Sequence, residues 1–333
     1  MPAVVLDAPG RVELVEVPWA ARGGLVVVEP EVVGICGTDL GVVAGEVPVA
    51  TPRVLGHELV GRLVGGDLPE GWQLGERVLV DPADACGSCP VCRRGLGHLC
   101  PRGGLMGREV DGALAGRVPV SPTRLHRVPD ELDQASAAIL QVLGTCVHAQ
   151  RNVALSVGRV AAVVGLGVAG LLQAQLLAAR GAGAVVAVGR SPGKRDLAAR
   201  LGAVAVEPGE AEGVVAELTG GVGAEVVVEA AGSSEALATA VRLAAPGGTV
   251  VRFGTAGDGS PVPLYELYRR ELTVTNPRAA GPMDYDDAVS LVVQGAVRAE
   301  GLVTHWLDPA QAAAALSEGL GADPGRLKAV VRW

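Results

Sequence analysis

The pattern of apolar positions changes once along the chain, near residue 135. Before that point, short apolar runs such as Val26–Val28 and Arg77–Val80 are separated by Gly and Pro turn signals. Short runs of β-branched residues between turn residues are typical of strands. The first 140 or so residues are therefore predicted to form a β-rich domain of short strands.

After residue 135, helical and extended patterns alternate. The segment Asp133–Leu143 is Ala-rich and is predicted to be helical. The predicted strands are Val160–Val164, Val185–Val188, Glu225–Glu229, Thr249–Phe253 and Leu272–Thr275, and the predicted helices are Leu171–Arg180 and Lys194–Leu201. This alternation indicates βαβ units on a parallel sheet, so the chain is predicted to be α/β. The pattern is helical again after Asn276, and Leu327–Arg332 is predicted to be a final strand.

The composition excludes several classes of function. The 333 residues are 49% hydrophobic but only 2% aromatic, so the core must be built from Val, Leu and Ala. A net charge of −8 argues against a nucleic-acid partner bound through its phosphates. No uncharged apolar stretch reaches about 18 residues, so no membrane span is expected, and Met1–Asp7 lacks the features of a signal peptide. We therefore expect a cytoplasmic protein whose six cysteines are metal ligands or free thiols.

Four cysteines occur in one short segment with the spacing C-x2-C-x2-C-x7-C, namely Cys86, Cys89, Cys92 and Cys100. Four thiolates complete the tetrahedral shell of a zinc ion and leave no position for a substrate. We therefore predict a structural zinc that fixes a loop rich in Gly, Pro and Arg.

A second, sparser set of metal-binding residues lies upstream. Cys36 occurs in Gly-Ile-Cys-Gly-Thr-Asp, and His57 and Glu58 occur in Gly-His-Glu. A catalytic zinc has a few protein ligands and one vacant position, and Cys36 and His57 fit the first two ligands. Glu58 either coordinates the ion or lies just behind it. One Cys and one His are weak evidence alone, and they gain weight from the other motifs.

A glycine loop follows the predicted strand Val160–Val164. It has the pattern G-x-G-x-x-G and leads into a helix. The glycines allow a tight turn and the close approach of a pyrophosphate to the N–H groups at the start of the helix. The predicted dinucleotide contacts are Gly165, Leu166, Gly167, Val168, Ala169 and Gly170.

The end of the next strand indicates which dinucleotide binds. NAD enzymes normally place Asp or Glu there to bind the ribose hydroxyls, whereas this chain has Gly189-Arg190-Ser191. We expect Gly189 to leave room for a phosphate, Arg190 to pair with it and Ser191 to donate to it, with Arg195 in support. NADP(H) is therefore predicted to be preferred. The alternative is that Arg190 is a solvated surface charge and that NAD(H) binds as well.

In combination, these motifs resemble those of the zinc-containing medium-chain dehydrogenases, over nearly the whole chain. GICGTD at 34–39 and GHELVG at 56–61 are similar to the family's catalytic-zinc motifs, and the four-cysteine segment is similar to its structural-zinc loop. PGGTVVRFG at 246–254 and LVTH at 302–305 are similar to later landmarks. The resemblance implies a GroES-like catalytic domain from residues 1–144 and 277–333, a Rossmann domain from residues 145–276, two zinc ions per subunit, and a homodimer or homotetramer.

Two positions depart from the commonest family pattern. Another zinc ligand often comes from a Glu or Cys on the helix before the Rossmann domain, where this chain has Gln141, with Cys146 nearby as a less favoured substitute. Gly41 stands where many polyol and threonine dehydrogenases have a proton-relaying His. Both departures resemble the glucose dehydrogenase branch. They leave proton transfer to Thr38, ribose hydroxyls or water.

The resemblance implies the reversible oxidation of an alcohol by NAD(P), with Cys36, Thr38, His57, Glu58 and Gln141 as catalytic residues. The favoured substrate is a sugar or polyol, and glucose oxidised at C1 is the best single hypothesis. Candidate hydroxyl-binding residues are Glu109, Asp111 and Asn276, and Asn276 is also a candidate cofactor contact. The favoured alternative for each is a structural or solvated side chain. The alternatives are a polyol, amino-polyol or threonine dehydrogenase, and a non-catalytic protein that binds zinc and NADPH as a sensor.

Overall fold

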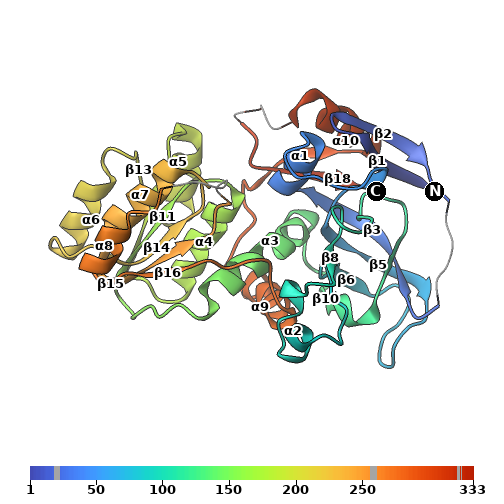
Figure 1. Ribbon diagram of the computed structural model, residues 1–333, viewed down its shortest axis with the longest axis horizontal. Coiled ribbons are helices and arrows are strands. Elements are labelled where there is room, and N and C mark those ends of the chain that lie inside the picture. Colours follow the sequence, from blue (N-terminus) through green and yellow to red (C-terminus); the bar gives the residue numbers. More distant parts are fainter. Residues whose placement is uncertain (19–22, 256–260, 321–322, 324) are drawn as a thin grey trace. The chain divides into compact units, whose positions relative to one another are not determined.

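The computed structural model describes residues 1–18, 23–255, 261–320, 323 and 325–333. These residues form two compact units (Figure 1). Unit 1 comprises Met1–Gly144, Gly281–Val289 and Ala299–Trp333, and unit 2 comprises Thr145–Ala280 and Ser290–Arg298. These bounds differ from the predicted ones by residues 277–280 and 290–298, which belong to unit 2.

Unit 1 is built mainly from strands, as its short apolar runs predict. Its elements are β1 (Pro2–Ala8), β2 (Arg11–Glu16), β3 (Val26–Ile35), α1 (Gly37–Val43), β4 (Arg53–Val54), β5 (Glu58–Gly66), β6 (Arg77–Val80), β7 (Ala83–Asp84), α2 (Pro90–Arg93), η1 (Gly97–Leu99), β8 (Gly104–Leu105), β9 (Val118–Val120), η2 (Pro122–Arg124), β10 (Leu125–Arg127), β17 (Val303–Leu307), α10 (Pro309–Glu318) and β18 (Lys328–Arg332). The main sheet has the order β10-β6-β5-β3-β18-β17, with β9 also paired to β3. The predicted final strand is thus confirmed as β18, and it returns to unit 1 antiparallel to β3.

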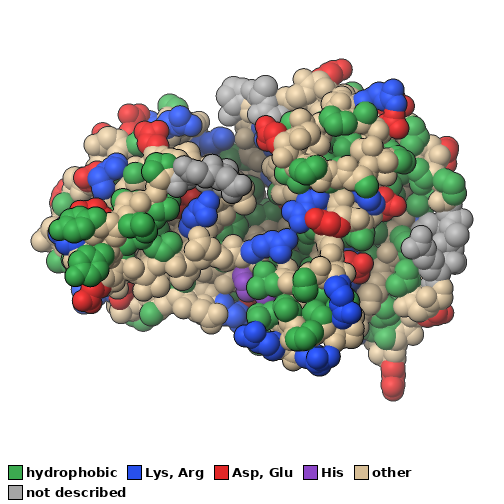
Figure 2. Space-filling view, in the orientation of Figure 1, with side chains coloured by type: hydrophobic (Ala, Val, Ile, Leu, Met, Phe, Trp, Pro, Cys, Tyr) green, Lys and Arg blue, Asp and Glu red, His purple; other side chains and the backbone are tan. Residues whose placement is uncertain are grey.

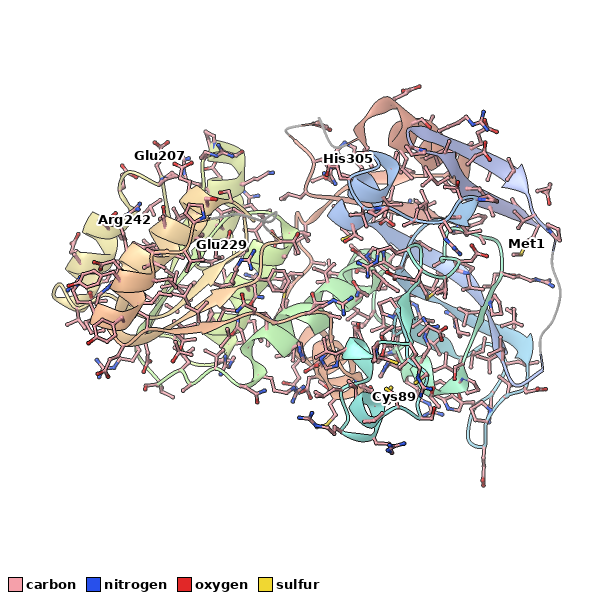
Figure 3. All side chains as sticks on the ribbon, in the orientation of Figure 1. Met1, Cys89, Glu207, Glu229, Arg242 and His305 are labelled. Carbon is pink, nitrogen blue, oxygen red and sulfur yellow. The ribbon has the colours of Figure 1, made fainter. Side chains whose placement is uncertain are left out.

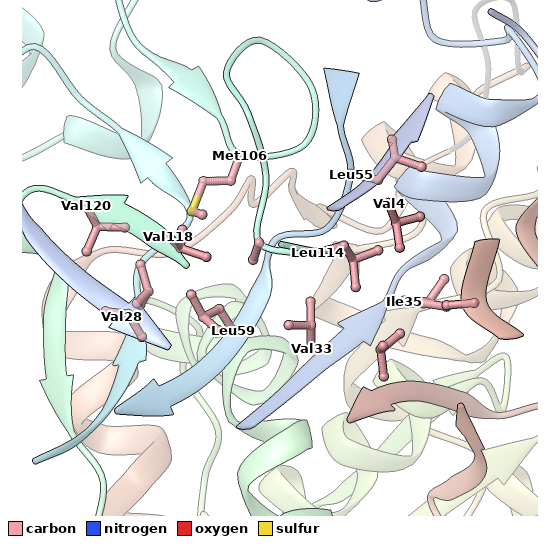
Figure 4. Packing of buried hydrophobic residues seen from close by; sticks show 14 of the residues in the cluster. Val4, Val28, Val33, Ile35, Leu55, Leu59, Met106, Leu114, Val118 and Val120 are labelled. Atoms are coloured by element: carbon pink, nitrogen blue, oxygen red, sulfur yellow. The ribbon is translucent and has the colours of Figure 1, made fainter. Parts of the chain in front are cut away.

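The core of unit 1 consists of aliphatic side chains from strands that are far apart in the sequence. Val28, Val33 and Ile35 of β3 pack against Leu59 of β5 and Leu114, as Figure 4 shows. All five are at most 2% exposed. This packing holds the end of β3 and the start of β5 in fixed positions, and these are the segments that carry the sparser metal-binding set.

Unit 2 alternates strands with helices. Its elements are β11 (Val160–Val164), α4 (Val168–Ala179), β12 (Ala184–Val188), α5 (Pro192–Arg200), β13 (Val204–Val206), α6 (Ala211–Thr219), β14 (Ala224–Glu229), α7 (Ser234–Leu243), β15 (Ala244–Arg252), α8 (Leu264–Arg269) and β16 (Thr273–Thr275). The strands form one parallel sheet with the order β13-β12-β11-β14-β15-β16. The five strands and two helices predicted after residue 155 are therefore confirmed, within a few residues at their ends.

Helices cover both faces of this sheet. Successive residues of β11 alternate between two apolar clusters: Ala162 and Val164 pack with α6 and α7, and Ala161 and Val163 pack with α4. A parallel strand that is buried on both faces reads as an unbroken apolar run, which is why β11 is visible in the sequence.

Helix α3 (Gln134–Arg151) extends beyond the predicted segment, which ended at Leu143. The boundary between units 1 and 2 falls inside it, after Gly144. Helix α9 (Pro282–Val293) likewise contributes to both units. Among the described residues, no helix combines the length and the apolar character needed to cross a membrane.

Candidate functional site

The four-cysteine segment brings its sulfur atoms together. The Sγ atoms of Cys86, Cys89, Cys92 and Cys100 all lie within 4.8 Å of one another. The Cys89–Cys92, Cys89–Cys100 and Cys86–Cys92 separations are 3.4, 3.8 and 3.9 Å. Tetrahedral zinc with bonds of about 2.3 Å to sulfur requires separations of about 3.8 Å. The donor set and its spacing therefore fit a closed zinc site.

Donors around the four-cysteine segment favour the thiolates of Cys86 and Cys89, whereas desolvation raises the pKa of Cys92. The backbone N–H of Cys92 donates to the Cys89 sulfur over 3.4 Å, and Arg102 donates to the Cys86 sulfur over 3.3 Å. The backbone of Ser88 lowers the pKa of Cys86 to about 5. Basic side chains gather over the α2 region on the face shown in Figure 2, and Cys89 is labelled beside α2 in Figure 3. This positive surrounding offsets part of the charge of four thiolates.

The second group consists of Cys36, His57 and Glu58. One ligand atom from each lies within 4.8 Å of the other two. Cys36 is the residue before α1, at the end of β3, and Glu58 begins β5 directly after His57. Because β3 and β5 are antiparallel neighbours in register at Gly34 and Glu58, residues 21 apart in the chain meet at one place. The pairing of β3 with β5 therefore explains why Cys36 lies beside His57.

Asp39 ties together the two segments that carry this group. Its carboxylate accepts from the backbone N–H of Cys36 over 2.8 Å and from that of Gly56 over 3.2 Å. It also lies 3.5 Å from Nδ1 of His57. Burial disfavours the charged forms of Asp39 and His57. The effect of the Asp39 carboxylate outweighs burial and raises the pKa of His57 well above its ordinary value. Contact with Asp39 fixes the ring orientation and leaves Nε2 of His57 as the ligand atom.

Glu58 forms a buried ion pair with Lys328, the first residue of β18. The side chains are 1% and 2% exposed, and Nζ of Lys328 contacts Oε2 of Glu58 and the carbonyl oxygen of Ile35. Gly34 makes room for them, since a Cβ there would overlap Oε2 of Glu58 and lie 2.7 Å from Cε of Lys328. The other carboxylate oxygen, Oε1, is buried without a hydrogen-bond partner among the described residues. A cation would satisfy it, so this group also fits a metal.

Gln141, a predicted zinc ligand, also contacts a buried tyrosine. It is 7% exposed, and a side-chain hydrogen bond joins it to Tyr285, which is fully buried. Burial raises the pKa of Tyr285 well above its ordinary value, so its hydroxyl keeps its proton. The amide of Gln141 has an oxygen and an NH₂ group, so one end can contact Tyr285 while the other serves a metal.

Cys146, considered as a substitute ligand, has a different environment. It is fully buried, and its thiol donates to the carbonyl oxygen of Ala169 over 3.7 Å. Burial raises the pKa of this thiol far above its usual range, which disfavours a metal-binding thiolate. Cys146 is a small core residue.

The glycine loop of unit 2 has the geometry of a phosphate site. Gly165 has φ +105°, in the region that favours glycine, and a Cβ on Gly170 would overlap the carbonyl oxygen of Gly165. Gly167 precedes α4, and a Cβ there would meet no atom within 4 Å among the described residues. Helix α4 therefore begins beside an open position at Gly167, and the N–H groups of a first helical turn are those that anion binding uses.

At the end of β12, two residues with predicted roles have close neighbours. The position of a side chain on Gly189 is taken by Leu166, whose Cδ1 would lie 2.6 Å from a Cβ. Arg195 donates to the carbonyl oxygens of Gly189 and Arg190 and pairs with Glu207 over 2.6 Å. Arg195 therefore braces the loop, because its charge is already paired.

Arg190 and Ser191 keep side chains that can meet a ligand. Arg190 is exposed, and its guanidinium forms no ion pair with any residue that the structure describes. Ser191 precedes α5, and its hydroxyl makes no capping hydrogen bond. The positive charge at this sheet edge is therefore that of Arg190.

The three candidate hydroxyl-binding residues differ in their surroundings. Glu109 accepts from the N–H of Leu105 over 2.8 Å and from Arg108, and Asp111 accepts from Arg53 over 2.9 Å. Glu109 thus stabilises the turn after Leu105, and Asp111 links its own segment to β4 of unit 1. Asn276 is exposed directly after β16, at the carboxyl edge of the unit 2 sheet.

Comparison with known proteins agrees with this arrangement. The model of the alcohol dehydrogenase GroES-like domain matches residues 22–130, and that of the zinc-binding dehydrogenases matches residues 168–294. A 2-dehydro-3-deoxy-L-galactonate 5-dehydrogenase of Pseudoalteromonas atlantica is 30% identical over 318 residues, which are 94% of this chain and 92% of the relative. The L-galactonate-5-dehydrogenase of Escherichia coli is 34% identical over 279 residues, 82% and 81% of the two chains.

This chain belongs to the zinc-containing medium-chain dehydrogenases. A solved structure from Sinorhizobium meliloti 1021, described as a zinc-binding dehydrogenase bound to NADP, has a TM-score of 0.91 and 32% identity and covers 100% of this chain and 99% of its own. Alcohol dehydrogenase TADH from Thermus sp. ATN1 also has a TM-score of 0.91, with 30% identity and the same coverage. The predicted family and fold class, a GroES-like domain and a Rossmann domain, are thereby confirmed.

The sequence did not reveal several residues that this dehydrogenase places at its sites. Lys328 is 270 positions from Glu58, and no local pattern links them. Glu207 follows β13 and meets Arg195 only because β12 and β13 are neighbours. The role of Asp39 could have been predicted from the sequence, since a carboxylate three residues after Cys36 can accept a hydrogen bond from the N–H of Cys36 at the start of a helix.

Proposed function

We propose that this dehydrogenase oxidises a secondary alcohol of a polyol, sugar or sugar acid, with zinc and NAD(P)⁺. The observation that carries the proposal is the group of Cys36, His57 and Glu58, in which Oε1 of Glu58 lacks a partner. Support for the substrate class comes from relatives named L-galactonate-5-dehydrogenase, sorbitol dehydrogenase and D-xylulose reductase. All three names denote reactions of polyhydroxylated compounds.

Cys36 and His57 would hold the catalytic zinc, with Glu58 or Gln141 as the further ligand. A zinc ion held there supplies a Lewis acid that makes an alcohol hydroxyl more acidic. Thr38 lies beside this group, with its Oγ1 3.8 Å from the Cys36 sulfur. We assign Oγ1 of Thr38 the task of accepting the alcohol proton while its own proton passes toward solvent. Gly41 contributes no side chain to this transfer.

Lys328 controls the charge of this group. Its ammonium holds Oε2 of Glu58, so only Oε1 is available to a metal. Lys328 thereby reduces the negative charge at the site and favours ionisation of an alcohol more than an unpaired Glu58 carboxylate would. It also keeps the buried carboxylate in place when Gln141 is the ligand.

We propose that NADP(H) is preferred and that NAD(H) is also bound. Arg190 supports this preference, because a guanidinium at the end of β12 can pair with a 2′-phosphate. Arg195 would support it through the loop that carries Arg190, whose carbonyl oxygen accepts from Arg195. We further propose two zinc ions per chain, one in each cysteine-containing group, and a homodimer or homotetramer in the cytoplasm.

The second candidate is an aldose 1-dehydrogenase acting on glucose. Gln141 and the lack of a His at Gly41 favour it, because both resemble the glucose dehydrogenase branch. Hydride would then leave a hemiacetal carbon and give a lactone. Among the relatives reported above, none is named for this reaction.

A substrate panel tests these candidates, with NADPH or NADH formation followed at 340 nm. We expect turnover of L-galactonate, sorbitol or xylitol, and its loss by at least about 100-fold in His57→Ala at equal protein concentration. Asp111→Asn is the matched control, since Asp111 links its own segment to β4 of the same unit, and it should keep full activity. Turnover of glucose alone would favour the second candidate. Binding of zinc and NADPH without turnover of any alcohol would favour a sensor and refute the proposal.

A further inference from the structure

A buried carboxylate lies at the carboxyl edge of the unit 2 sheet, at the point where the strand order reverses. Glu229 is the last residue of β14, labelled in Figure 3, and is 1% exposed. It pairs in register with Val164 of β11, the residue before the glycine loop. From β11 the chain builds outward through β12 and β13, and then crosses to β14 and builds the other way. Dinucleotides bind beyond the strand ends at this reversal.

Glu229 holds the loop that follows its own strand. Its Oε1 accepts from the N–H groups of Ala231 and Gly232, each over 2.7 Å. A Cβ on Gly254, after β15, would lie 2.7 Å from its Oε2, and a Cβ on Gly165 would lie 2.7 Å from the nitrogen of Ala231. The loops after β11, β14 and β15 therefore pack against one another around this carboxylate.

Glu229 forms no ion pair with a Lys, Arg or His side chain within the part of unit 2 that the structure describes, although Arg252 of β15 is in register with it. Its Oε1 accepts from two backbone N–H groups. A carboxylate accepts hydrogen bonds and donates none, as Oε1 of Glu229 does here. Glu229 therefore places a carboxylate at the sheet edge in a position shielded from water.

Glu229 lies on the side of the strand reversal where one of the two mononucleotides is expected to bind. The adenosine ribose belongs at the end of β12, where Arg190 and Ser191 lie. The two mononucleotides bind on opposite sides of the strand reversal, so the nicotinamide half belongs over β14 and β15. Glu229 is the charged residue at the end of β14.

We propose that Glu229 is a specificity-determining residue that distinguishes the oxidised from the reduced cofactor. The inference rests on the proposed dinucleotide function. The oxidised nicotinamide ring carries one positive charge. When the alcohol carbon gives up its hydride, the electron pair enters the ring, the C–H bond breaks, a C–H bond forms on the ring and the positive charge disappears. A nearby fixed negative charge therefore attracts the oxidised ring and has no such effect on the reduced one.

The test measures the dissociation constants of NADP⁺ and NADPH, and of NAD⁺ and NADH, by titration calorimetry on the zinc-loaded full chain. In Glu229→Gln the amide oxygen can still accept from Ala231 and Gly232, so the loop keeps its bonds while the charge is lost. We expect the ratio of the oxidised to the reduced dissociation constant to rise by about three- to tenfold, as one screened unit charge implies.

Two further variants separate charge from position. Glu225→Gln removes a carboxylate from the amino end of the same strand, where Glu225 accepts from Ser156 over 2.8 Å, and it should leave the ratio unchanged. Glu229→Asp keeps the charge on a shorter side chain, so its ratio should stay near that of the unmodified chain even where both affinities fall. It also provides a test should Glu229→Gln fold poorly.

The outcomes distinguish this inference from the function on which it rests. An unchanged ratio in Glu229→Gln, with both forms bound equally more weakly, would mean that Glu229 only holds the loops and would overturn the inference. A raised ratio in Glu225→Gln would attribute the effect to net charge and would also overturn it. Failure of the unmodified chain to bind either form of either cofactor would refute the proposed dehydrogenase function itself.

Discussion

Replacing Lys328 by Met removes the positive partner of Glu58 beneath the second metal-binding group. Met keeps most of the length of the lysine stem, so packing beside Gly34 is largely preserved. What is lost is the contact of Nζ with Oε2 of Glu58 and with the carbonyl oxygen of Ile35. Glu58 would then be left as an uncompensated charge at 2% exposure.

The expected loss of stability is large because both partners are buried. Their side chains are 2% and 1% exposed, so solvent screens the pair very little. Breaking a buried ion pair by removing one partner costs about 3–5 kcal/mol. With a urea dependence of about 3 kcal/mol per M, this lowers the unfolding midpoint of the metal-free protein by about 1–1.7 M. Bound zinc partly replaces the lost charge, so the loss should be smaller in the zinc-loaded protein.

The assay is urea unfolding with and without zinc, followed by circular dichroism. Lys194, the chain's other lysine, lies on α5, and Lys194→Met is the matched control that should unfold like the unmodified chain. The double variant Lys328→Met with Glu58→Gln should regain part of the loss, because no unpaired charge remains. Equal midpoints for Lys328→Met and the unmodified chain would refute the buried pair.

Three further predictions concern the other sites. Arg190→Ala should lower kcat/KM for NADP⁺ by about 10- to 100-fold and leave kcat/KM for NAD⁺ nearly unchanged, because only NADP⁺ loses a charge-assisted hydrogen bond. An equal loss for both cofactors would refute the role of Arg190. Cys92→Ser should remove one zinc equivalent and expose residues 86–100 to proteolysis, whereas Cys146→Ala should keep all bound zinc; metal analysis and limited proteolysis check this. Gly170→Ala should lower Tm because its Cβ meets the backbone of Gly165. Gly167→Ala, whose Cβ meets no atom of the described residues within 4 Å, should keep the Tm of the unmodified chain but lose cofactor affinity. Equal Tm values in the two variants would contradict the close packing of this loop.

Features that depend on neighbours in sequence were predictable. The strand β11 and the glycine loop lie within eleven consecutive residues, and an apolar run followed by G-x-G-x-x-G determines both. The four-cysteine segment is also local, since its ligands span residues 86–100. The conformation of each depends on short-range turn and helix geometry, which residue types alone indicate.

Features that depend on strand pairing were not predictable in the same way. Lys328 reaches Glu58 because β18 lies next to β3, and β3 lies next to β5. The space beside Gly189 is filled by Leu166, from the loop after the adjacent strand β11, so a glycine there did not mean open space. Arg195 was expected to support phosphate binding, and its ion pair with Glu207, from beyond β13, was not visible in the sequence. Each of these contacts depends on a residue on a neighbouring strand or in the loop that follows it.

The most direct test of the central claim is the zinc content of the purified chain after reconstitution and removal of excess metal. We expect two zinc ions per chain in the unmodified protein, and one in Cys36→Ser and in His57→Ala, with the four-cysteine site still filled in both. One zinc ion per chain in the unmodified protein, retained in full by Cys36→Ser, would contradict the assignment of Cys36, His57 and Glu58 as a metal site.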